Sequence, residues 1–490
     1  MSSCKLNVDV FLVIMSFADT TTVSNLMRTS STLHREGTRF LLRDVVDLKS
    51  GLQVTAFRRF MKNGPTHRRR VSLLHSLQLS MATISSTAAI SLEHLFGCLN
   101  TCGKLERLLL SHTELILSAN VGMVAAVSRL TTLKEVVLLK SGYCCVALLR
   151  CLCSSLTAAC IEFDGEDQER ILDPNDRYPS NTRDPIQLLS HSCDTLTTLY
   201  VGSPGHSSPD GPVYPSLREL NIEHGPPPVL SHLILAFPNL TSINFPDATP
   251  ERLELEAVDL PRHREMNIAH QVSHGSWSSL DEIEAEEILL LYLLALQCPV
   301  RVLRTEIHYT NDVDLLAEVL TDLTPGVLEL RIDEAYMINM DTGIVDALCE
   351  TRDPQITELR LFVEFQCRDV ALDVDSFLST MLDIARSLAM SLLLLHLECK
   401  FLSHQSCKLD DTGKSCPLKG EHRGWKGMYP AESALEELDL EAIAWRTMAA
   451  GPTLKTVEIR LVNSRTDLDE IAVVHSSGPS SSLDPTSRTV

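Results

Sequence analysis

A leucine pattern that recurs along most of the chain constrains the fold more than any other feature of the sequence. Its spacing is an apolar residue, two others, an apolar residue, one other, and a third apolar residue. Repeats of this pattern begin at Leu74, Leu105, Leu133, Leu156, Leu196, Leu217, Leu240, Val300, Val327, Ile356, Leu392, Leu435 and Leu454. Alternate apolar residues are typical of short strands with one buried face, so we expect parallel strands joined by covering segments.

The pattern resembles the leucine-rich repeat, which implies an α/β solenoid with parallel strands on the concave side and helices outside. We expect this irregular solenoid to span residues 74–463, with helical returns at 119–129, 230–236, 312–323, 342–350 and 374–391. Three segments do not fit the period and are interpreted as inserted loops: 164–186, 246–281 and 403–432. Residues 464–490 are rich in Ser and Pro toward their end and are expected to form a flexible tail.

Three short helices are expected before residue 48. One face of the first helix has the spacing i, i+3, i+4, i+7 and consists of Val8, Phe11, Leu12 and Met15. A second face is also apolar and consists of Val10, Val13, Ile14 and Phe17. Such a small module cannot bury a helix that is apolar nearly all round. The second face therefore either packs on the rest of the chain or docks another protein.

These helices resemble an F-box, in particular the F-box-like variant of large fungal families. The resemblance covers residues 5–48 and is carried by Leu6, Asp9, Val10, Ile14, Phe17, Leu26, Thr29, Ser30, Leu33 and Leu41. It implies binding to the acidic Skp-type adaptor of a cullin–RING ubiquitin ligase. The adaptor-docking residues are then expected to be Leu6, Asp9, Val10, Leu12, Ile14, Phe17 and Leu26.

Charge divides the chain near residue 70. Residues 1–70 carry twelve Lys or Arg against five Asp or Glu, whereas the remaining 420 carry 31 against 59. The acidic body argues against nucleic acid as a partner, because phosphate contacts need a basic face. Residues 49–73 form a basic connector. Its THRRRV segment belongs either to a solvated connector helix and loop broken at Gly64 and Pro65, or to a nuclear-import signal or a kinase site at Ser72.

Nothing in the sequence indicates a membrane protein. No apolar run reaches the roughly 18 residues that cross a bilayer, and the N-terminus lacks the pattern of a secretory signal. The fifteen cysteines are irregularly spaced. We therefore expect reduced thiols in an intracellular protein, cytoplasmic or nuclear, without a membrane partner.

The sequence carries no motif that indicates catalysis. It contains no Gly-rich phosphate loop, no G-x-S-x-G and no H-E-x-x-H. His404, Cys407, Cys416 and His422 lie close together in the sequence, but their spacing does not match that of structural zinc sites. Cysteines 144, 145, 151 and 153 are expected to fill the core. We expect no enzyme activity, metal or cofactor. A hydrolase site assembled from the irregular loops is the remaining alternative.

The acidic run 281–287 has two interpretations. Ser279 with Glu282 makes a capping box, and carboxylates suit the first turn of a helix, which favours a helix N-terminus. A metal site or a site for a basic partner is the other interpretation.

Strand residues between the inward positions are expected to form a candidate substrate face. The residues expected there are Glu329, Arg331, Glu358, Arg360, Glu437, Asp439 and Glu458. With neighbouring repeats in register, Glu329 would lie beside Glu358, and Arg331 beside Arg360. The acidic surplus biases this face toward a basic partner.

These features together predict a substrate-recognition subunit of a Skp–cullin–F-box ubiquitin ligase. Its solenoid would bind an unknown protein substrate while the N-terminal helices dock the adaptor. The alternative is a leucine-rich-repeat interaction scaffold with no ubiquitin-ligase link.

Overall fold

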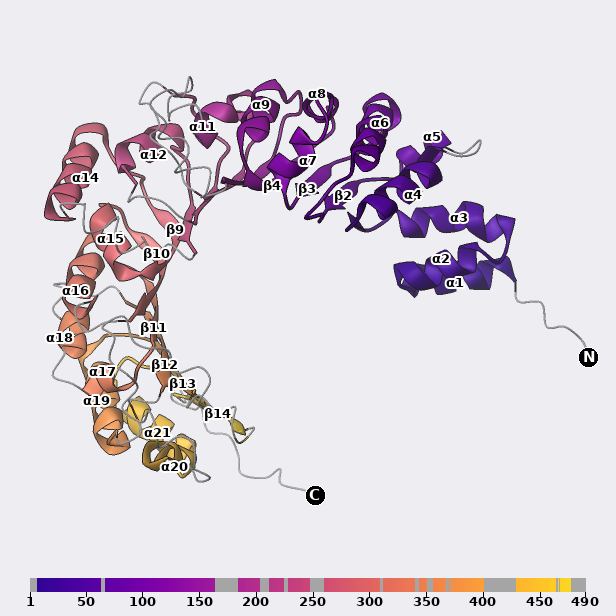
Figure 1. Ribbon diagram of the computed structural model, residues 1–490. Coiled ribbons are helices and arrows are strands. Elements are labelled where there is room, and N and C mark those ends of the chain that lie inside the picture. Colours follow the sequence, from indigo (N-terminus) through magenta and orange to yellow (C-terminus); the bar gives the residue numbers. More distant parts are fainter. Residues whose placement is uncertain are drawn as a thin grey trace, which may run out of the picture. The chain divides into compact units, whose positions relative to one another are not determined.

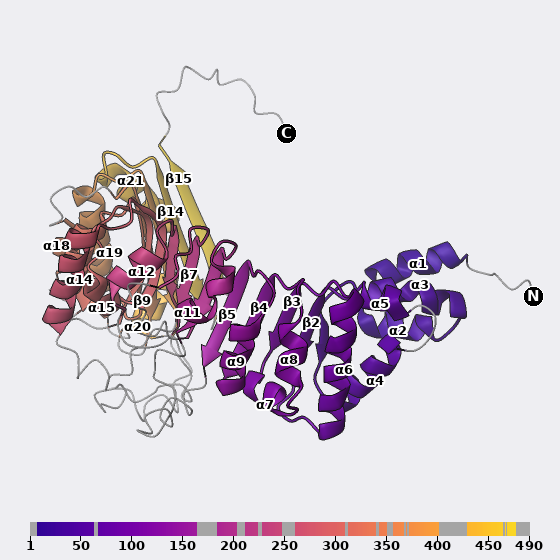
Figure 2. The ribbon, with the colours of Figure 1, turned by 90° about the horizontal axis from the view of Figure 1, so that it is seen from above.

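The computed structural model describes residues 7–62, 67–163, 184–202, 211–223, 228–246, 260–308, 312–339, 343–349, 356–366, 369, 372–400, 429–463, 466 and 468–476. The chain divides into two compact units. The first comprises Met1–Pro228 and His232–Leu240, and the second comprises Val229–Ser231 and Thr241–Val490. In each unit, helices alternate with strands that pair in chain order (Figures 1 and 2).

The first unit begins with three helices, α1 (Val8–Phe17), α2 (Thr20–Met27) and α3 (Ser31–Leu41). Its strands are β1 (Val46–Leu48), β2 (Ser76–Leu79), β3 (Arg107–Leu110), β4 (Glu135–Ser141), β5 (Ala158–Phe163), β6 (Thr198–Val201) and β7 (Glu219–Ile222). The helical segments between them are α4 (Gly51–Lys62), α5 (His67–Val71), α6 (Ser86–Cys102), α7 (Thr113–Ser118), α8 (Met123–Ser128), α9 (Tyr143–Cys151), α11 (Pro185–Leu188) and η2 (Ser190–Ser192). All neighbouring strands of this unit pair in parallel.

Helix α12 (Leu230–Ala236) lies at the division between the units. The strands of the second unit are β8 (Ser242–Phe245), β9 (Leu280–Glu287), β10 (Val300–Ile307), β11 (Val327–Ile332), β12 (Glu358–Phe365), β13 (Leu392–Cys399), β14 (Thr456–Asn463) and β15 (Leu468–His475). Its helices are α14 (Leu260–His274), α15 (Ile288–Leu294), α16 (Asp312–Leu323), α17 (Tyr336–Asn339), α18 (Ile344–Cys349), α19 (Val374–Ser387), α20 (Pro430–Glu436) and α21 (Leu440–Ala450). Strands β8 to β14 are parallel.

Alternate burial along the strands explains how this sequence stabilises the sheet. In β12, β13 and β14 every second residue is buried, and the residues between are partly exposed. The inward residues Leu359, Leu393 and Val457 are at most 3% exposed and lie at matching positions of neighbouring strands. The expected mixed α/β fold with parallel strands is confirmed. Pairing in chain order is compatible with a solenoid.

Two expected helical returns, 230–236 and 312–323, match α12 and α16. The expectation of a helix start at the acidic run is wrong. Residues 280–287 form strand β9, with Leu280, Ile283 and Ala285 buried. These three residues have the spacing of the leucine pattern. Pairing with β8 and β10 therefore outweighs the local capping signal.

The prediction of a repeat beginning at Leu435 is also wrong, because helices α20 and α21 occupy this segment in place of a strand. The expected flexible tail contains a strand, since β15 pairs antiparallel with β14. Helix α14 occupies part of the expected loop 246–281. The connector 49–73 contains α4 and α5. Most of the other two expected loops, 164–183 and 403–428, lies outside the described residues, as does the zinc candidate.

Among the described residues, no helix is both long enough and apolar enough to cross a membrane. Of the four cysteines expected in the core, Cys145 is buried, Cys144 is partly buried, and Cys151 and Cys153 are exposed.

Candidate functional site

The candidate site lies on one face of the second unit's sheet, which we call the open face. It consists of the partly exposed, alternate residues of β9 to β14, opposite the buried residues that face the helices. Because side chains at matching positions of neighbouring strands lie side by side, the register of the strands decides which charges meet.

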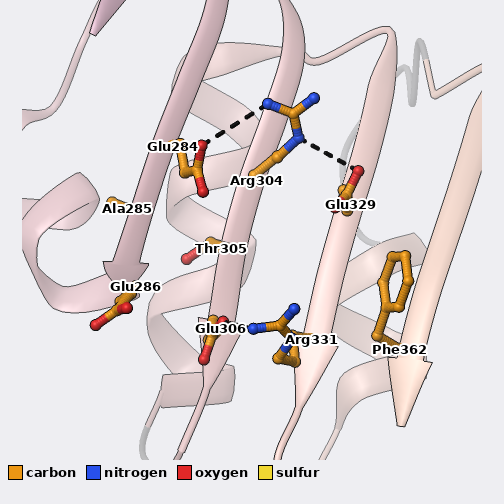
Figure 3. Close-up of a pocket in the computed structure, with 9 residues that line it drawn as sticks. All are labelled: Glu284, Ala285, Glu286, Arg304, Thr305, Glu306, Glu329, Arg331 and Phe362. Carbon is orange, nitrogen blue, oxygen red and sulfur yellow. Dashed lines mark hydrogen bonds and ion pairs between the residues drawn. The ribbon is translucent and has the colours of Figure 1, made fainter. Parts of the chain in front are cut away.

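A row of alternating charges crosses four strands of the open face. Glu284 of β9 lies beside Arg304 of β10, which lies beside Glu329 of β11, which lies beside Arg360 of β12. Arg304 Nε lies 3.3 Å from a Glu329 oxygen (Figure 3). Arg360 Nη1 lies 3.6 Å from the same oxygen. Each guanidinium therefore lies between carboxylates.

This register corrects the expectation that Glu329 would lie beside Glu358. The pairing of β11 with β12 places Val327 opposite Glu358 and Glu329 opposite Arg360, a shift of two residues. A two-residue shift keeps the same side chains on the same face, so the leucine pattern fits either register. The observed register pairs opposite charges and avoids the like-charge contacts.

A second row contains aromatic groups as well as charges. Glu306, Arg331, Phe362 and His396 lie at matching positions of β10 to β13. Arg331 Nη1 lies 2.7 Å from a Glu306 oxygen, so this arginine pairs across to β10. The Phe362 and His396 rings have centroids 5.5 Å apart. The row therefore changes from charged to aromatic as it crosses the sheet.

A small hollow lies between these two rows at the β9–β11 end. It has a volume of about 60 Å³ and is lined by Glu284, Ala285, Glu286, Arg304, Thr305, Glu306, Glu329, Arg331 and Phe362 (Figure 3). Four carboxylates and two guanidiniums surround it, so it carries an excess of negative charge. Burial raises the pKa of Glu284 and of Glu306, which shows that their charged forms are incompletely hydrated. A cation in this hollow would be favoured.

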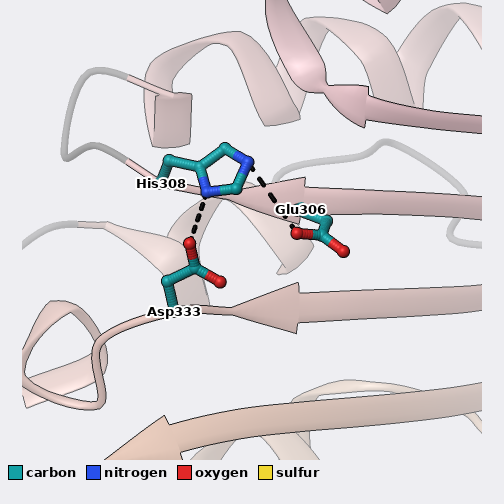
Figure 4. A group of neighbouring side chains, drawn as sticks. All are labelled: Glu306, His308 and Asp333. Atoms are coloured by element: carbon teal, nitrogen blue, oxygen red, sulfur yellow. Dashed lines mark hydrogen bonds and ion pairs between the residues drawn. The ribbon is translucent and has the colours of Figure 1, made fainter. Parts of the chain in front are cut away.

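His308, at the end of β10, lies between two carboxylates. Its Nδ1 is 2.5 Å from an Asp333 oxygen, and its Nε2 is 3.8 Å from a Glu306 oxygen (Figure 4). The hydrogen bond to Asp333 raises the pKa of His308 to about 9. The ligand atoms of the three residues lie within 4.8 Å of one another, which is close enough to hold a metal ion. At neutral pH the imidazole is protonated, and its single positive charge offsets one of these two carboxylates.

Two residues expected on the substrate face lie elsewhere. Glu437 follows α20 as its C-terminal cap, and Asp439 caps α21 by accepting a hydrogen bond from the Ala442 backbone N–H at 2.9 Å. Both belong to helix ends because residues 435–440 are not a strand. Glu329, Arg331, Glu358 and Arg360 do lie on the open face, and Glu458 lies on it at β14.

A group of apolar side chains at the β12–β15 end of the open face was not expected from the sequence. It consists of Phe362, Leu392, Leu394, Ile471 and Val473, which alternate with charged residues of the neighbouring strands. Ile471 and Val473 are 56% and 47% exposed. Their alternation within 468–475 indicates a strand. These two residues reach the open face only because β15 turns back and pairs antiparallel with β14, and the local sequence does not indicate that turn.

The N-terminal helices present a second candidate surface, which we call the α1 stripe. Most of the first apolar face of α1 packs inside the module: Phe11 and Leu12, together with Leu26 of α2, lie against a core that includes Met15, whereas Val8 is exposed. The second face is exposed and forms the α1 stripe, with Val10 at 42%, Val13 at 58%, Ile14 at 43% and Phe17 at 88%.

The remaining docking residues expected from the resemblance are distributed differently. Asp9 is exposed and accepts a hydrogen bond from the Asn7 side chain at 3.3 Å, while Asn7 caps α1. Leu12 and Leu26 help to hold the module together, so they contribute less to a free surface. Leu6 lies outside the described residues.

Comparison with known proteins places the chain in no established group. No family model matches it, and no curated protein shows significant sequence similarity.

Proposed function

We propose that this protein is a substrate-recognition subunit of a Skp–cullin–F-box ubiquitin ligase. In this proposal the α1 stripe docks the Skp-type adaptor, and the open face of the second unit holds a protein substrate. The chain itself performs no chemistry. It brings the substrate close to the ligase, which raises the effective concentration of the reacting groups.

The α1 stripe is the observation that carries this proposal. Four apolar side chains at positions 10, 13, 14 and 17 line one side of a ten-residue helix and remain in water. Exposed apolar patches of this kind mark protein interaction sites, and an amphipathic helix that lies in a groove uses the same spacing. Three of the residues that carry the resemblance to an F-box, Val10, Ile14 and Phe17, belong to the α1 stripe.

Charge complementarity supports the choice of adaptor. Residues 1–70 have a surplus of seven positive charges, and the adaptor family implied by the resemblance is acidic. Opposite charges around an apolar contact speed association and orient the partners. The α1 stripe would supply the apolar centre, and the arginines of α3 to α5 would form the charged rim.

A charge placed in the α1 stripe tests the proposal. We expect Val13→Asp with Phe17→Asp to abolish co-purification of the adaptor, because an interface centre tolerates no unpaired charge. Leu12→Asp is a poorer variant, because Leu12 packs against the module core.

The matched control is Leu52→Asp on α4, since Leu52 is 85% exposed and Phe17 is 88% exposed. We expect the control to bind the adaptor normally. Circular dichroism of both proteins checks that the helices still form. Undiminished adaptor binding by the Val13/Phe17 variant would contradict the ligase assignment and leave an interaction scaffold without a ubiquitin-ligase link.

A further inference from the structure

The open face of the second unit differs between its two ends. Toward β9 it is acidic, and toward β15 it is apolar. This division concerns only the described strands of one unit, and it gives the face a direction that a partner can recognise.

The acidic end has more carboxylates than its arginines can balance. On β9 to β12, seven glutamates face three arginines: Glu282, Glu284, Glu286, Glu306, Glu329, Glu358 and Glu364 against Arg304, Arg331 and Arg360, and Glu364 has a lysine partner, Lys400. The surplus is greatest at β9, where three glutamates lie on one strand. The hollow of about 60 Å³ opens beside them. It has room for the ammonium end of a lysine, which is about the size of a water molecule.

Toward β15, apolar side chains lie on both sides of the charged residues of β14. Leu394 lies beside Glu458, and Val473 lies on the other side of Glu458 at the same position of β15. Ile471 lies beside Arg460, whose guanidinium is held by Asp469 at 2.8 Å. Phe362 joins the two ends, because its ring lines the hollow and also contacts the His396 ring. An aromatic ring at that point can pack against the stem of a long basic side chain.

We propose that the open face binds an extended segment of the substrate. This segment contains a lysine or arginine and, about three to four residues before or after it, an apolar residue. The proposal deepens the proposed function by naming the class of substrate segment. The basic side chain enters the hollow among Glu284, Glu286 and Glu306. The apolar residue packs on Leu394, and the peptide beyond it passes over Glu458 toward Val473.

The spacing follows from the strand geometry. The hollow lies over β9 to β11, and Leu394 is on β13, two to three strands away. Neighbouring strands are about 4.8 Å apart, so the separation is roughly 10 to 14 Å. An extended peptide that crosses the strands advances about 3.3 Å per residue, which corresponds to about three to four residues.

The test measures binding of short fluorescent peptides to the full-length protein by anisotropy. The probe has one arginine, then three serines, then two leucines, within a neutral, polar background. One control peptide has glutamine in place of arginine, and a second has serine in place of the leucines. We expect each control peptide to bind at least tenfold more weakly than the probe. This comparison uses the unmodified protein.

Protein variants locate the site. Glu284→Gln with Glu286→Gln removes two negative charges from the hollow while keeping its shape. We expect it to weaken the probe about tenfold without affecting the glutamine peptide. Val473→Asp should weaken the probe but not the leucine-free peptide. The matched control is Glu437→Gln, which lies at a helix end outside the face.

The outcomes separate this inference from the ligase assignment, because no adaptor is present. Peptide binding with this dependence supports the inference whether or not the adaptor binds. Three results would overturn the inference. The arginine and glutamine peptides could bind equally, the variants on the open face could leave the probe's affinity unchanged, or the probe could show no saturable binding.

Discussion

Two glycines in helices provide a direct test of the N-terminal module, because the same substitution should have opposite effects at each. Gly37 lies in α3 and faces the module core. A Cβ there would lie 2.3 Å from Met15 Cε and 2.5 Å from Met27 Cγ. Gly97 lies in α6 and is exposed, and a Cβ there would meet nothing within 4 Å.

The expected magnitudes follow from two opposing effects. Alanine is more favourable than glycine inside a helix by about 0.8–1 kcal/mol. Overpacking a core by one methyl costs roughly 1–3 kcal/mol. Met15 Cε can swing away, but Met27 Cγ lies close to its own backbone and cannot, so a cost of about 2 kcal/mol is expected. Gly37→Ala should therefore destabilise the module by about 1 kcal/mol, whereas Gly97→Ala should stabilise α6 by up to about 1 kcal/mol.

Hydrogen exchange with mass spectrometry measures these effects locally. Gly37→Ala should reduce the protection of amides in residues 8–42, and Gly97→Ala should increase it in 86–102. Adaptor binding should weaken only in the Gly37 variant, since α1 packs on α3 through Met15 and Gly37. Increased protection of 8–42 in Gly37→Ala would show that the three helices do not pack as described.

Three further predictions concern the second unit. His308→Gln should lower the melting temperature most near pH 6 and hardly at all near pH 10: the pKa of His308 is raised from 6.5 to about 9, so its stabilising effect is complete below about 6.5 and is lost as pH rises through about 9. A melting-temperature difference that is independent of pH would contradict this pairing. Leu359→Ala, at a fully buried position, should cost about 2–5 kcal/mol and reduce hydrogen-exchange protection in β11 to β13 while leaving α1 to α3 unchanged. Val474→Asp places a charge at a position only 4% exposed and should detach β15, so that the bared edge of β14 promotes aggregation measured by light scattering; a monodisperse variant would refute this role for β15.

Twelve of the thirteen predicted repeats form strands, because burial of every second residue depends on local sequence; the repeat at Leu435 does not. The leucine pattern does not predict the register. In β11 the buried residues Leu328, Leu330 and Ile332 alternate, and β13 has the same alternation. A series of three inward residues fits its neighbour equally well when it is moved by two positions. Only contacts between strands distinguish the two arrangements.

The acidic run shows the opposite failure, in which a local signal is overridden by its surroundings. Ser279 and Glu282 have the spacing of a capping box, yet residues 280–287 form β9. In isolation, three glutamates on one strand face would repel each other. Arg304 on β10 contacts Glu282 and lies 3.8 Å from Glu284, which reduces that repulsion. The stabilising residue is about twenty positions away, beyond the reach of a local motif.

The candidate site depends on the register more than the fold does. With the expected register, like charges would lie side by side, and repulsion would extend across β11 and β12. With the observed register, Arg360 lies opposite Glu329 and beside Glu358, so most charges in the middle of the face are balanced locally. The unbalanced carboxylates are then concentrated on β9. An acidic face therefore becomes a single acidic end beside a hollow, and its position relative to Leu394 and Val473 is what gives the proposed peptide a defined spacing.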